Sequence, residues 1–405
     1  MGLKLLELAK NIRQIVNKRG SKYIIRNKKT NELDGLLFSL LHTQKSISMD
    51  SAAASFNDFN ENILKRKDKI SRQSLSSRAS DLPESFYKNV CNDVFKLIDK
   101  MYNKRKKSDR TYEICAVDGS DSNVSKSIAK DGFKLNKNGN TVTALNMGIY
   151  NVTRNYPVDI QMVNHKNERK AFLDMINKRK DFSNTIFVFD RGFDGQSFFE
   201  KLERMNIKYL CRIRSNSLLV TDNNDMIHMM SEHRCRIINY NIGNKKYYLA
   251  TNLFDTNEFT IPVLSQLYNK RWTIEESFKY MKNNFSFGVS ELTSAIAIRK
   301  SIYCQMMIMK LVNLIAKINN RQFTRVKANR IINKKTLTDG FYRGFIFRLF
   351  SNTLSRRNIL SFNKNYIVLI TTNTGKFNER ICVTPGLKWY TKQHTNKQNP
   401  LIVDG

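Results

Sequence analysis

Residues 186–195 read IFVFDRGFDG, an apolar stretch of strand length that ends at Asp190. Residues 196–205 have the apolar spacing of a helix, and residues 209–213 form another short apolar run. A strand followed by a helix and a second strand indicates an α/β sheet. Because functional side chains gather beyond strand ends in such sheets, Asp190 is a candidate site residue.

The chain upstream of this stretch contains three further predicted strands and one helix. The strands occupy residues 112–117, 141–150 and 158–163, and the helix occupies residues 167–178. A run of strands followed by strands alternating with helices predicts a mixed α/β sheet flanked by helices. The first strand is expected to end at Asp118, in the words AVDGS.

Neither aspartate is specific alone, because Asp followed by Gly at a strand end is also a common turn. Asp121 and Asp194 are nearby rivals, and each is expected in the loop beyond its strand. Residues 214–255 then interrupt the pattern: they are polar, with short strand candidates at 235–240 and 246–250. We interpret this segment as an insertion.

A long helical stretch from Pro262 to about Phe285 carries the most specific pattern, LYNKRWTIEESFKYMKNNF at residues 267–285. At about 100° per residue, four polar side chains fall in one narrow stripe beside the apolar face. They are Tyr268, Arg271, Glu275 and Lys282. Glu276 falls far from this stripe, so Glu275 is the better candidate. The alternative is an ordinary amphipathic helix with a polar edge.

Composition favours a nucleic-acid partner. The chain has 405 residues with 69 Lys and Arg against 35 Asp and Glu, a net charge of +34. Residues 1–110 hold 24 basic and 12 acidic residues (+12), residues 277–405 hold 22 and 4 (+18), and residues 111–276 hold 23 and 19 (+4). A polyanion partner explains such basic flanks. A general bias towards lysine codons is the alternative, but it does not explain the acid-rich middle.

Other classes of protein are disfavoured. The six cysteines are scattered without a Cys-x-x-Cys pair, which argues against a disulfide framework or zinc ribbon. The most apolar stretch, residues 302–318, is interrupted by Gln305, Lys310, Asn313 and Lys317, so no membrane span is predicted. We therefore expect a soluble, cytoplasmic protein.

The first 110 residues are predicted to be helical. Residues 51–65 and 71–80 form two short predicted helices, the second with Ser71 as its N-cap and an outward face of Arg72, Gln73, Ser76 and Arg78. A helix-turn-helix places such a helix in the major groove, although many helical hairpins have the same pattern. The run KRKK at residues 104–107 is interpreted as an exposed linker or a solvated charge cluster.

Taken in order, these motifs resemble the DDE transposases of bacterial insertion sequences. The likeness is to the branch with a Tyr-Arg-Glu-Lys signature, through RWTIEESFKYMK, VFDRGFDG and AVDGS, and it covers about residues 111–290. It implies an RNase H-like catalytic fold with a strand-rich insertion before the glutamate helix. It also implies a metal triad of Asp118, Asp190 and Glu275, with Tyr268, Arg271 and Lys282 contacting DNA.

The activity implied is cleavage at the ends of an insertion sequence and transfer of the freed 3′-hydroxyl strand into target DNA. Three converging carboxylates are suited to two Mg²⁺ ions, with Mn²⁺ as a possible substitute. The expected partners are double-stranded DNA and a second copy of the chain in a synaptic homodimer, in the bacterial cytoplasm at the nucleoid. A DNA-binding protein without transposition and a plain RNase H-like nuclease are the two alternatives.

The resemblance also implies an aromatic residue, often Trp, that stabilises a flipped base from the insertion. The chain has tryptophan only at positions 272 and 389, outside that segment. Tyr240, Tyr247 or Tyr248 could substitute, but an ordinary strand role is favoured for them. Hairpin formation is therefore left open. The predicted organisation is a helical DNA-binding region (1–110), a catalytic domain in two parts (111–213 and 257–350), the insertion (214–256) and a basic C-terminal region (351–405).

Overall fold

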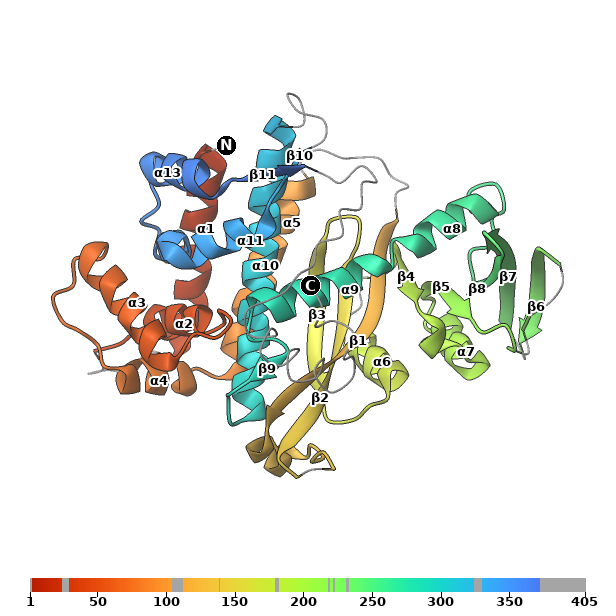
Figure 1. Cartoon of the computed structure of the whole chain (residues 1–405), viewed down its shortest axis with the longest axis horizontal. Helices are drawn as coiled ribbons and strands as arrows, with labels where there is room; N and C mark the ends of the chain where they lie inside the picture. Colours follow the sequence, from red (N-terminus) through yellow and green to blue (C-terminus); the bar gives the residue numbers. More distant parts are fainter. Residues whose placement is uncertain are drawn as a thin grey trace, which may run out of the picture.

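The computed structural model describes residues 2–23, 29–103, 112–137, 139–178, 182–217, 219–220, 223–230, 233–323 and 330–371. The described residues form one large sheet with a lobe of helices beside it, and the long helix α10 (Ala295–Phe323) runs between the two (Figure 1). The predicted linker at residues 104–107 and Trp389 lie outside the described residues.

The large sheet is mixed. Its strands are β1 (Glu113–Ser125), β2 (Thr141–Asn151), β3 (Tyr156–Val163), β4 (Thr185–Phe189), β5 (Lys208–Ile213), β6 (Asp225–Met230), β7 (His233–Ile242), β8 (Lys245–Thr251) and β9 (Val289–Ser290). They follow the order β3-β2-β1-β4-β5-β8-β7-β6, with β9 beside β1. The strands β1, β2 and β3 pair antiparallel, whereas β4 and β5 run parallel to β1. The predicted mixed α/β sheet, RNase H-like in its order of elements, is confirmed.

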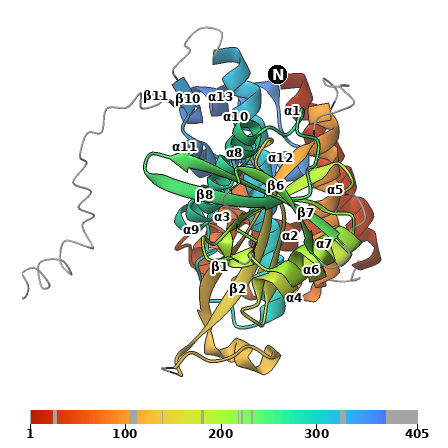
Figure 2. The same ribbon diagram turned by 90° about the vertical axis from the view of Figure 1, so that its right-hand side faces the viewer.

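Helices cover both faces of this sheet. Besides α10, the α-helices of the described residues, in the lobe and on the sheet together, are α1 (Gly2–Gly20), α2 (Glu32–Leu41), α3 (Met49–Asn62), α4 (Arg72–Asp81), α5 (Glu84–Asn103), α6 (Glu168–Asn177), α7 (Gln196–Arg204), α8 (Ile261–Asn269), α9 (Trp272–Asn284), α11 (Lys334–Gly340), α12 (Ile346–Ser351) and α13 (Arg356–Tyr366). Figure 2 shows α6 and α7 on one side of the sheet and α8 and α9 on the other. Alternate residues of β1 divide accordingly: Cys115 and Val117 belong to the core under α6 and α7, and Ala116 belongs to the core under α9.

The prediction that the first strand ends at Asp118 is wrong. β1 continues for seven residues beyond it, to Ser125, because β2 pairs with it along this whole length. The other neighbour, β4, ends at Phe189, so only that side of β1 is open at the level of Asp118. The aspartate therefore lies inside a strand, next to the end of its neighbour.

The segment interpreted as an insertion contains three strands, and they extend the main sheet. β8 pairs antiparallel with β5, and β7 and β6 follow beyond it. The buried Arg236 fixes β7, because its guanidinium binds both oxygens of Asp225 at 2.8 and 2.6 Å and the carbonyls of Leu253 and Phe259 at 2.9 Å. The insertion is thus joined to the main sheet by the hydrogen bonds between β5 and β8.

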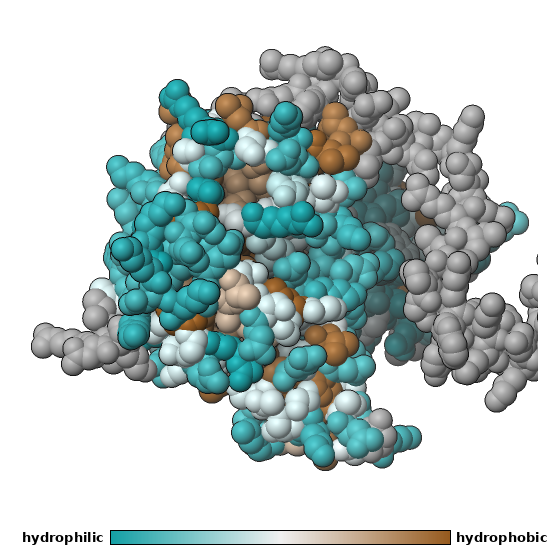
Figure 3. Space-filling view, turned by 60° about the vertical axis from the view of Figure 1, so that its left-hand side comes forward, coloured by the Kyte–Doolittle hydropathy of each residue, from teal (hydrophilic) through white to brown (hydrophobic). Residues whose placement is uncertain are grey.

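The helical lobe is built from both ends of the chain. One hydrophobic core includes Leu5 and Leu8 of α1, Met307 of α10 and Phe350 and Phe362 of the C-terminal helices. The outer face of this lobe is mostly hydrophilic, with small hydrophobic patches between (Figure 3). By length and composition, Ala295–Asn320 could cross a membrane, but 89% of its most apolar part is buried inside the protein.

The two short helices predicted in the N-terminal region are α3 and α4. Ser71 caps α4 as expected, because its hydroxyl accepts the N–H of Ser74 at 3.2 Å, and Arg72 and Gln73 are exposed. Arg78 was predicted to face outward and does not: it is buried, donates to the carbonyl of Tyr23 at 2.8 Å and lies 3.6 Å from Glu32. It holds α4 to the lobe, while Arg72 and Gln73 remain on the exposed face.

Candidate active site

Asp118 lies in β1, and Asp190 directly follows the neighbouring parallel strand β4. The register between these strands ends with the pair Ala116 and Val188, and each aspartate lies two residues beyond one member of that pair. Neighbouring strands are about 4.8 Å apart, and residues two apart on one strand face the same side of the sheet. Both aspartates therefore face α9, as Ala116 and Val188 face the helices on that side.

Aromatic packing fixes the strand end that carries Asp190. Phe187 and Phe189 of β4 contact Phe172 of α6 with ring centroids 5.1 and 5.0 Å apart, and Phe198 of α7 lies 5.4 Å from Phe189. The chain then turns sharply, because Oδ1 of Asp190 accepts the N–H of Gly192 at 2.8 Å. Oδ1 of Asp118 likewise accepts the N–H of Gly119 at 2.9 Å.

Gly148 of β2 brings α9 close to the aspartates. It pairs with Asp118 across the two strands, and a Cβ on it would lie 2.7 Å from Cζ of Phe278. The missing side chain therefore lets the ring of Phe278 rest on the strand. Since Glu275 lies one helical turn before Phe278, this contact brings the Glu275 end of α9 to the same part of the sheet.

The predicted single helix from residue 262 to residue 285 is two helices. α8 ends at Asn269 and α9 begins at Trp272, with the N–H of Arg271 bonded to the carbonyl of Tyr268 at 2.9 Å, a tighter turn than an α-helix makes. The four signature residues are thus divided: Tyr268 is on α8, Arg271 precedes α9, and Glu275 and Lys282 are on α9.

Arg271 is buried and holds the carboxylate of Glu275. Its Nη2 donates to Oε1 of Glu275 at 2.6 Å, and the Arg271 side chain is 7% exposed. Tyr268 was expected to pack against DNA, but it is 5% exposed and packs in the core under α8. Burial raises the pKa of Tyr268 to about 12 against the opposing charge of Arg271. Tyr268 therefore supports Arg271 from within the protein.

The two aspartates repel each other in a half-buried setting. Burial, and then the charge of Asp190, raise the pKa of Asp118 to about 7, while Arg271 opposes the rise. The Glu168 carboxylate at the start of α6 raises it further, and the pKa of Glu168 is itself raised by burial and by Asp190. A divalent cation between these groups would remove the repulsion.

Oxygen ligands of this kind suit Mg²⁺ or Mn²⁺. Within the described residues, no three His, Cys, Asp or Glu side chains are already close enough together to hold a metal ion. The Glu275 carboxylate is bonded to Arg271. Asp118, Asp190 and Glu275 each carry the oxygen donors that such a cation takes.

The rival aspartates have other partners. Asp121 pairs with Lys166 at 2.5 Å on the exposed part of β1. Asp194 accepts the backbone N–H of Arg214 at 2.9 Å and the hydroxyl of Ser217 at 3.3 Å, and so braces the loop after β5. Neither carboxylate is as free to receive a ligand as Asp118 or Asp190.

Lys282 lines a groove between the end of α9 and the turn after α2 of the helical lobe. This groove of about 600 Å³ is lined by Lys282 and Asn283 of α9, by Asp121 and Asn123 of β1, and by the turn after α2, which includes Lys45. Lys282 and Glu275 are seven residues apart, so both face the same side of α9. The sequence pattern did not single out Lys45, because only the tertiary fold brings it to this groove.

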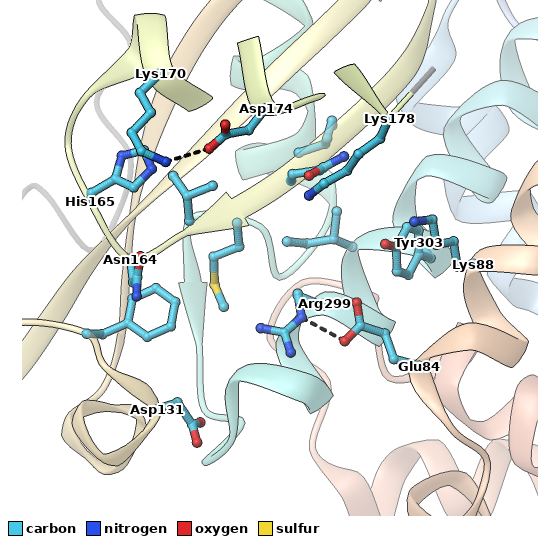
Figure 4. Close-up of a pocket in the computed structure, with 16 residues that line it drawn as sticks. Glu84, Lys88, Asp131, Asn164, His165, Lys170, Asp174, Lys178, Arg299 and Tyr303 are labelled. Atoms are coloured by element: carbon cyan, nitrogen blue, oxygen red, sulfur yellow. Dashed lines mark hydrogen bonds and ion pairs between the residues drawn. The ribbon is translucent and has the colours of Figure 1, made fainter. Parts of the chain in front are cut away.

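A separate cavity of about 480 Å³ lies at the outer edge of the sheet, beside β3 (Figure 4). Two ion pairs lie in its wall: Arg299 binds Glu84 at 2.8 Å and Lys170 binds Asp174 at 2.7 Å. Asp131 accepts the N–H of Ala295 at 2.8 Å. Lys88 and Lys178 also line this cavity.

The aromatic residues of the insertion form part of its own packing. The rings of Tyr240 and Tyr247 stack with centroids 5.7 Å apart, and Arg212 lies 4.6 Å from the Tyr247 centroid. Lys246 lies 5.5 Å from the Tyr248 centroid. Trp272, by contrast, is 56% exposed at the start of α9, where Arg271 lies 5.1 Å from its ring.

Comparison with known proteins identifies a family for the central part of the chain. Residues 109–309, about half of the chain, match the family model described as the transposase DDE domain. No curated protein matches the chain at a significant level. A solved structure, a piggyBac transposase synaptic complex with hairpin DNA, is 12% identical and superposes with a TM-score of 0.45 over 96% of this chain and 88% of that chain. Residues 109–309 therefore belong to the transposase DDE domain family, and they support assignment of the chain as a DDE transposase.

Proposed function

We propose that this protein cleaves DNA at the ends of an insertion sequence and transfers the freed 3′-hydroxyl strand into target DNA. The observation that carries the proposal is the placement of Asp118 in β1 and of Asp190 at the end of the neighbouring parallel strand β4, in a segment that matches the transposase DDE domain. The Tyr-Arg-Glu-Lys order at residues 268–282 favours the branch of bacterial insertion-sequence enzymes with that signature.

Asp118, Asp190 and Glu275 are proposed to be the catalytic carboxylates and the ligands of two Mg²⁺ ions, which Mn²⁺ would replace. When bound, such ions activate the attacking hydroxyl and stabilise the leaving oxygen. Arg271 keeps Glu275 on the correct side of α9, since its fork is already bonded to that carboxylate. It acts as a positioning residue, because its own side chain is buried.

DNA is proposed to enter along the groove of Lys282 and Lys45. Both ammonium groups suit phosphate oxygens, and the groove is bounded by the end of α9 on one side and by the turn after α2 on the other. The exposed Arg72 and Gln73 on the first turn of α4 are the candidate base-reading residues of the helix-turn-helix. The net charge of +34 supports steeply salt-dependent binding.

Synapsis of two DNA ends requires two active sites, so we propose a homodimer on DNA, in the bacterial cytoplasm at the nucleoid. A decayed copy that only binds DNA is the second candidate. The presence of all six signature residues argues against it, because any of them would be free to change without function. A plain nuclease is disfavoured, because simple hydrolysis does not need such basic flanks.

The decisive experiment is cleavage of a duplex that carries the DNA flanking this gene, compared with a scrambled duplex, in Mg²⁺. The protein should cut only at the true end and join that strand to a second duplex. Asp190→Ala should lose cleavage and keep DNA binding. Binding without cutting by the wild type would favour the decayed copy, and equal cutting of both duplexes would favour the nuclease.

A further inference from the structure

The turn that carries Asp190 contains two glycines, and each makes room for a polar group. A Cβ on Gly192 would lie 2.9 Å from Oδ1 of Asp190, the oxygen that accepts the N–H of Gly192. A Cβ on Gly195 would lie 2.7 Å from Nη1 of Arg169. Neither glycine has the left-handed φ that favours this residue, and Gly195 is extended, with φ 171°. Space, rather than backbone conformation, is therefore what glycine provides at these two positions.

The guanidinium next to Gly195 bridges two carbonyls of the turn. Arg169, in the first turn of α6, donates from Nη2 to the carbonyl of Gly192 at 3.0 Å and to that of Asp194 at 2.7 Å. Its Nε also donates to Gly192, at 3.3 Å. Arginine presents its donors in a rigid planar fork, so one side chain can hold both carbonyls at once. The first turn of α6 is thereby tied to the turn after β4.

Gly192 connects this contact to Asp190. Its carbonyl accepts from Arg169, and its N–H donates to Oδ1 of Asp190 at 2.8 Å. The carboxylate of Asp190 is thus oriented by a residue that Arg169 holds from the other side. The far end of the turn is held as well, because Asp194 accepts the backbone N–H of Arg214 at 2.9 Å. The Asp190 carboxylate is therefore the last group in a chain of contacts that begins on α6.

We propose that Arg169 is a positioning residue of the active site, which fixes the Asp190 carboxylate through Gly192, and that Gly195 is needed to admit its guanidinium. This inference rests on the proposed function, because Asp190 is one of the proposed carboxylates of the cation site. Arg169 acts through the backbone, since its hydrogen bonds go to carbonyls of the turn. Removing a group that orients a metal ligand typically lowers metal affinity or activity by about 10- to 100-fold.

The first measurement is hydrogen exchange of the metal-free, full-length protein, followed by mass spectrometry of the peptides that span residues 190–195. Arg169→Ala removes the donors that hold this turn, so its amides should exchange faster, by about fivefold or more. Lys170→Ala is the matched control. It removes the next cation along α6, which pairs with Asp174 at 2.7 Å in the wall of the outer cavity (Figure 4), and exchange over 190–195 should match the wild type.

The second measurement is the Mn²⁺ concentration that half-saturates cleavage of the duplex carrying the flanking DNA. In Arg169→Ala this concentration should rise by about tenfold or more, with DNA binding unchanged, because a displaced Asp190 holds the cation less well. A loss of stability alone would lower the amount of active protein and leave this concentration unchanged. Arg169→Lys keeps a donor but not the fork, so it should fall between Arg169→Ala and the wild type.

Gly195→Ala tests the same contact from the other side, because it keeps Arg169 and takes away its space. The Mn²⁺ requirement should rise in this variant too, and the double variant Arg169→Ala, Gly195→Ala should be no worse than Arg169→Ala alone, since both changes act through one contact. Full additivity of the two effects would overturn the role of Gly195. If Arg169→Ala does not fold, Arg169→Lys and Gly195→Ala decide the question by the same two measurements.

The outcomes distinguish this inference from the proposed function. Wild-type exchange over residues 190–195 in Arg169→Ala, or a wild-type Mn²⁺ requirement, would overturn the role of Arg169 and leave Asp190 as a proposed ligand. Equal effects of Lys170→Ala and Arg169→Ala would show that only the charge of α6 matters, which also overturns the inference. A wild-type protein that does not cleave in Mn²⁺, or wild-type cleavage by Asp190→Asn, would overturn the proposed function itself and the inference with it.

Discussion

The ring of Phe278 occupies the space above Gly148, the residue that pairs with Asp118 across β1 and β2. This contact brings α9 close to the strand that pairs with Asp118, and Ile274 and Met281 of the same helix are buried with Phe278. The absence of a side chain on Gly148 thus helps to position the helix that carries the proposed catalytic residue Glu275.

Gly148→Ala should lift α9. The new Cβ would lie 2.7 Å from Cζ of Phe278, and overpacking of this kind costs about 1–3 kcal/mol. We expect a lower free energy of unfolding in urea and a large loss of end cleavage with DNA binding retained. The double variant Gly148→Ala, Phe278→Leu removes the clash and should recover part of both losses. No recovery would mean that Phe278 does not transmit the effect.

Substitutions of Arg271 and Lys282 should differ in their effects on DNA binding. Lys282→Ala removes a phosphate contact in the groove, so it should weaken binding and reduce the salt dependence of log Kd by about one unit of slope. Arg271→Ala should abolish cleavage but leave the salt slope unchanged, because Arg271 is buried against Glu275. Kd measured over a range of salt concentrations decides this, and a reduced slope in Arg271→Ala would place that residue on DNA.

Removing either partner of the buried ion pair between α5 and α10 should destabilise the protein, but by different amounts. Lys310 is 1% exposed, pairs with Asp99 at 3.1 Å and lies 4.0 and 3.8 Å from the ring centroids of Phe95 and Tyr156. Asp99→Ala leaves the Lys310 ammonium buried without its carboxylate partner, which should lower the free energy of unfolding by about 3–5 kcal/mol. Lys310→Met should cost far less, because Asp99 keeps the hydroxyl of Tyr156 at 2.5 Å and Arg154 at 3.5 Å. Urea unfolding of both variants tests this, and equal losses would contradict it.

Lys334 should make stability depend on pH. Burial lowers its pKa to about 8, and no carboxylate of the described residues offsets that effect. Between pH 8 and 10.5 the unfolded chain therefore binds more protons at this residue than the folded chain does, so its contribution to stability rises with pH. Lys334→Met should be more stable than the wild type at pH 7, by at most about 3 kcal/mol, and this advantage should shrink as pH rises through 8.

The exposed neighbour Lys335 provides the control for that measurement. Lys335→Met makes the same change without burial, so its stability relative to the wild type should not vary with pH across this window. Free energies of unfolding measured at pH 7, 8 and 9 are sufficient. If the stability advantage of Lys334→Met stays constant with pH, burial of the charged Lys334 ammonium does not destabilise the folded protein, and the prediction is wrong.

Much of the catalytic region could be predicted from the sequence because its elements are locally specified. The apolar runs at 141–150, 158–163 and 186–189 correspond to β2, β3 and β4, and the helical spacing at 167–178 corresponds to α6. Each of these elements has an apolar face with its own period, and that period is a property of neighbouring residues. The candidate residues Asp118, Asp190 and Glu275 followed from the same local patterns.

Tertiary structure decided what depends on partners distant in the sequence. β1 continues beyond Asp118 because β2 pairs with it, and β6 to β8 extend the main sheet because the edge of β5 accepts β8. Tyr268 and Arg271 fall on one helical stripe with Glu275, yet burial places them inside the protein.

The sequence alone thus determined the order of elements and the carboxylates at the sheet, since period and turn chemistry act over a few residues. Only the fold decided that Gly148 admits Phe278, that Gly195 admits Arg169 and that Lys45 joins Lys282 in one groove. These contacts join residues that are far apart in the chain, so local sequence patterns cannot predict them.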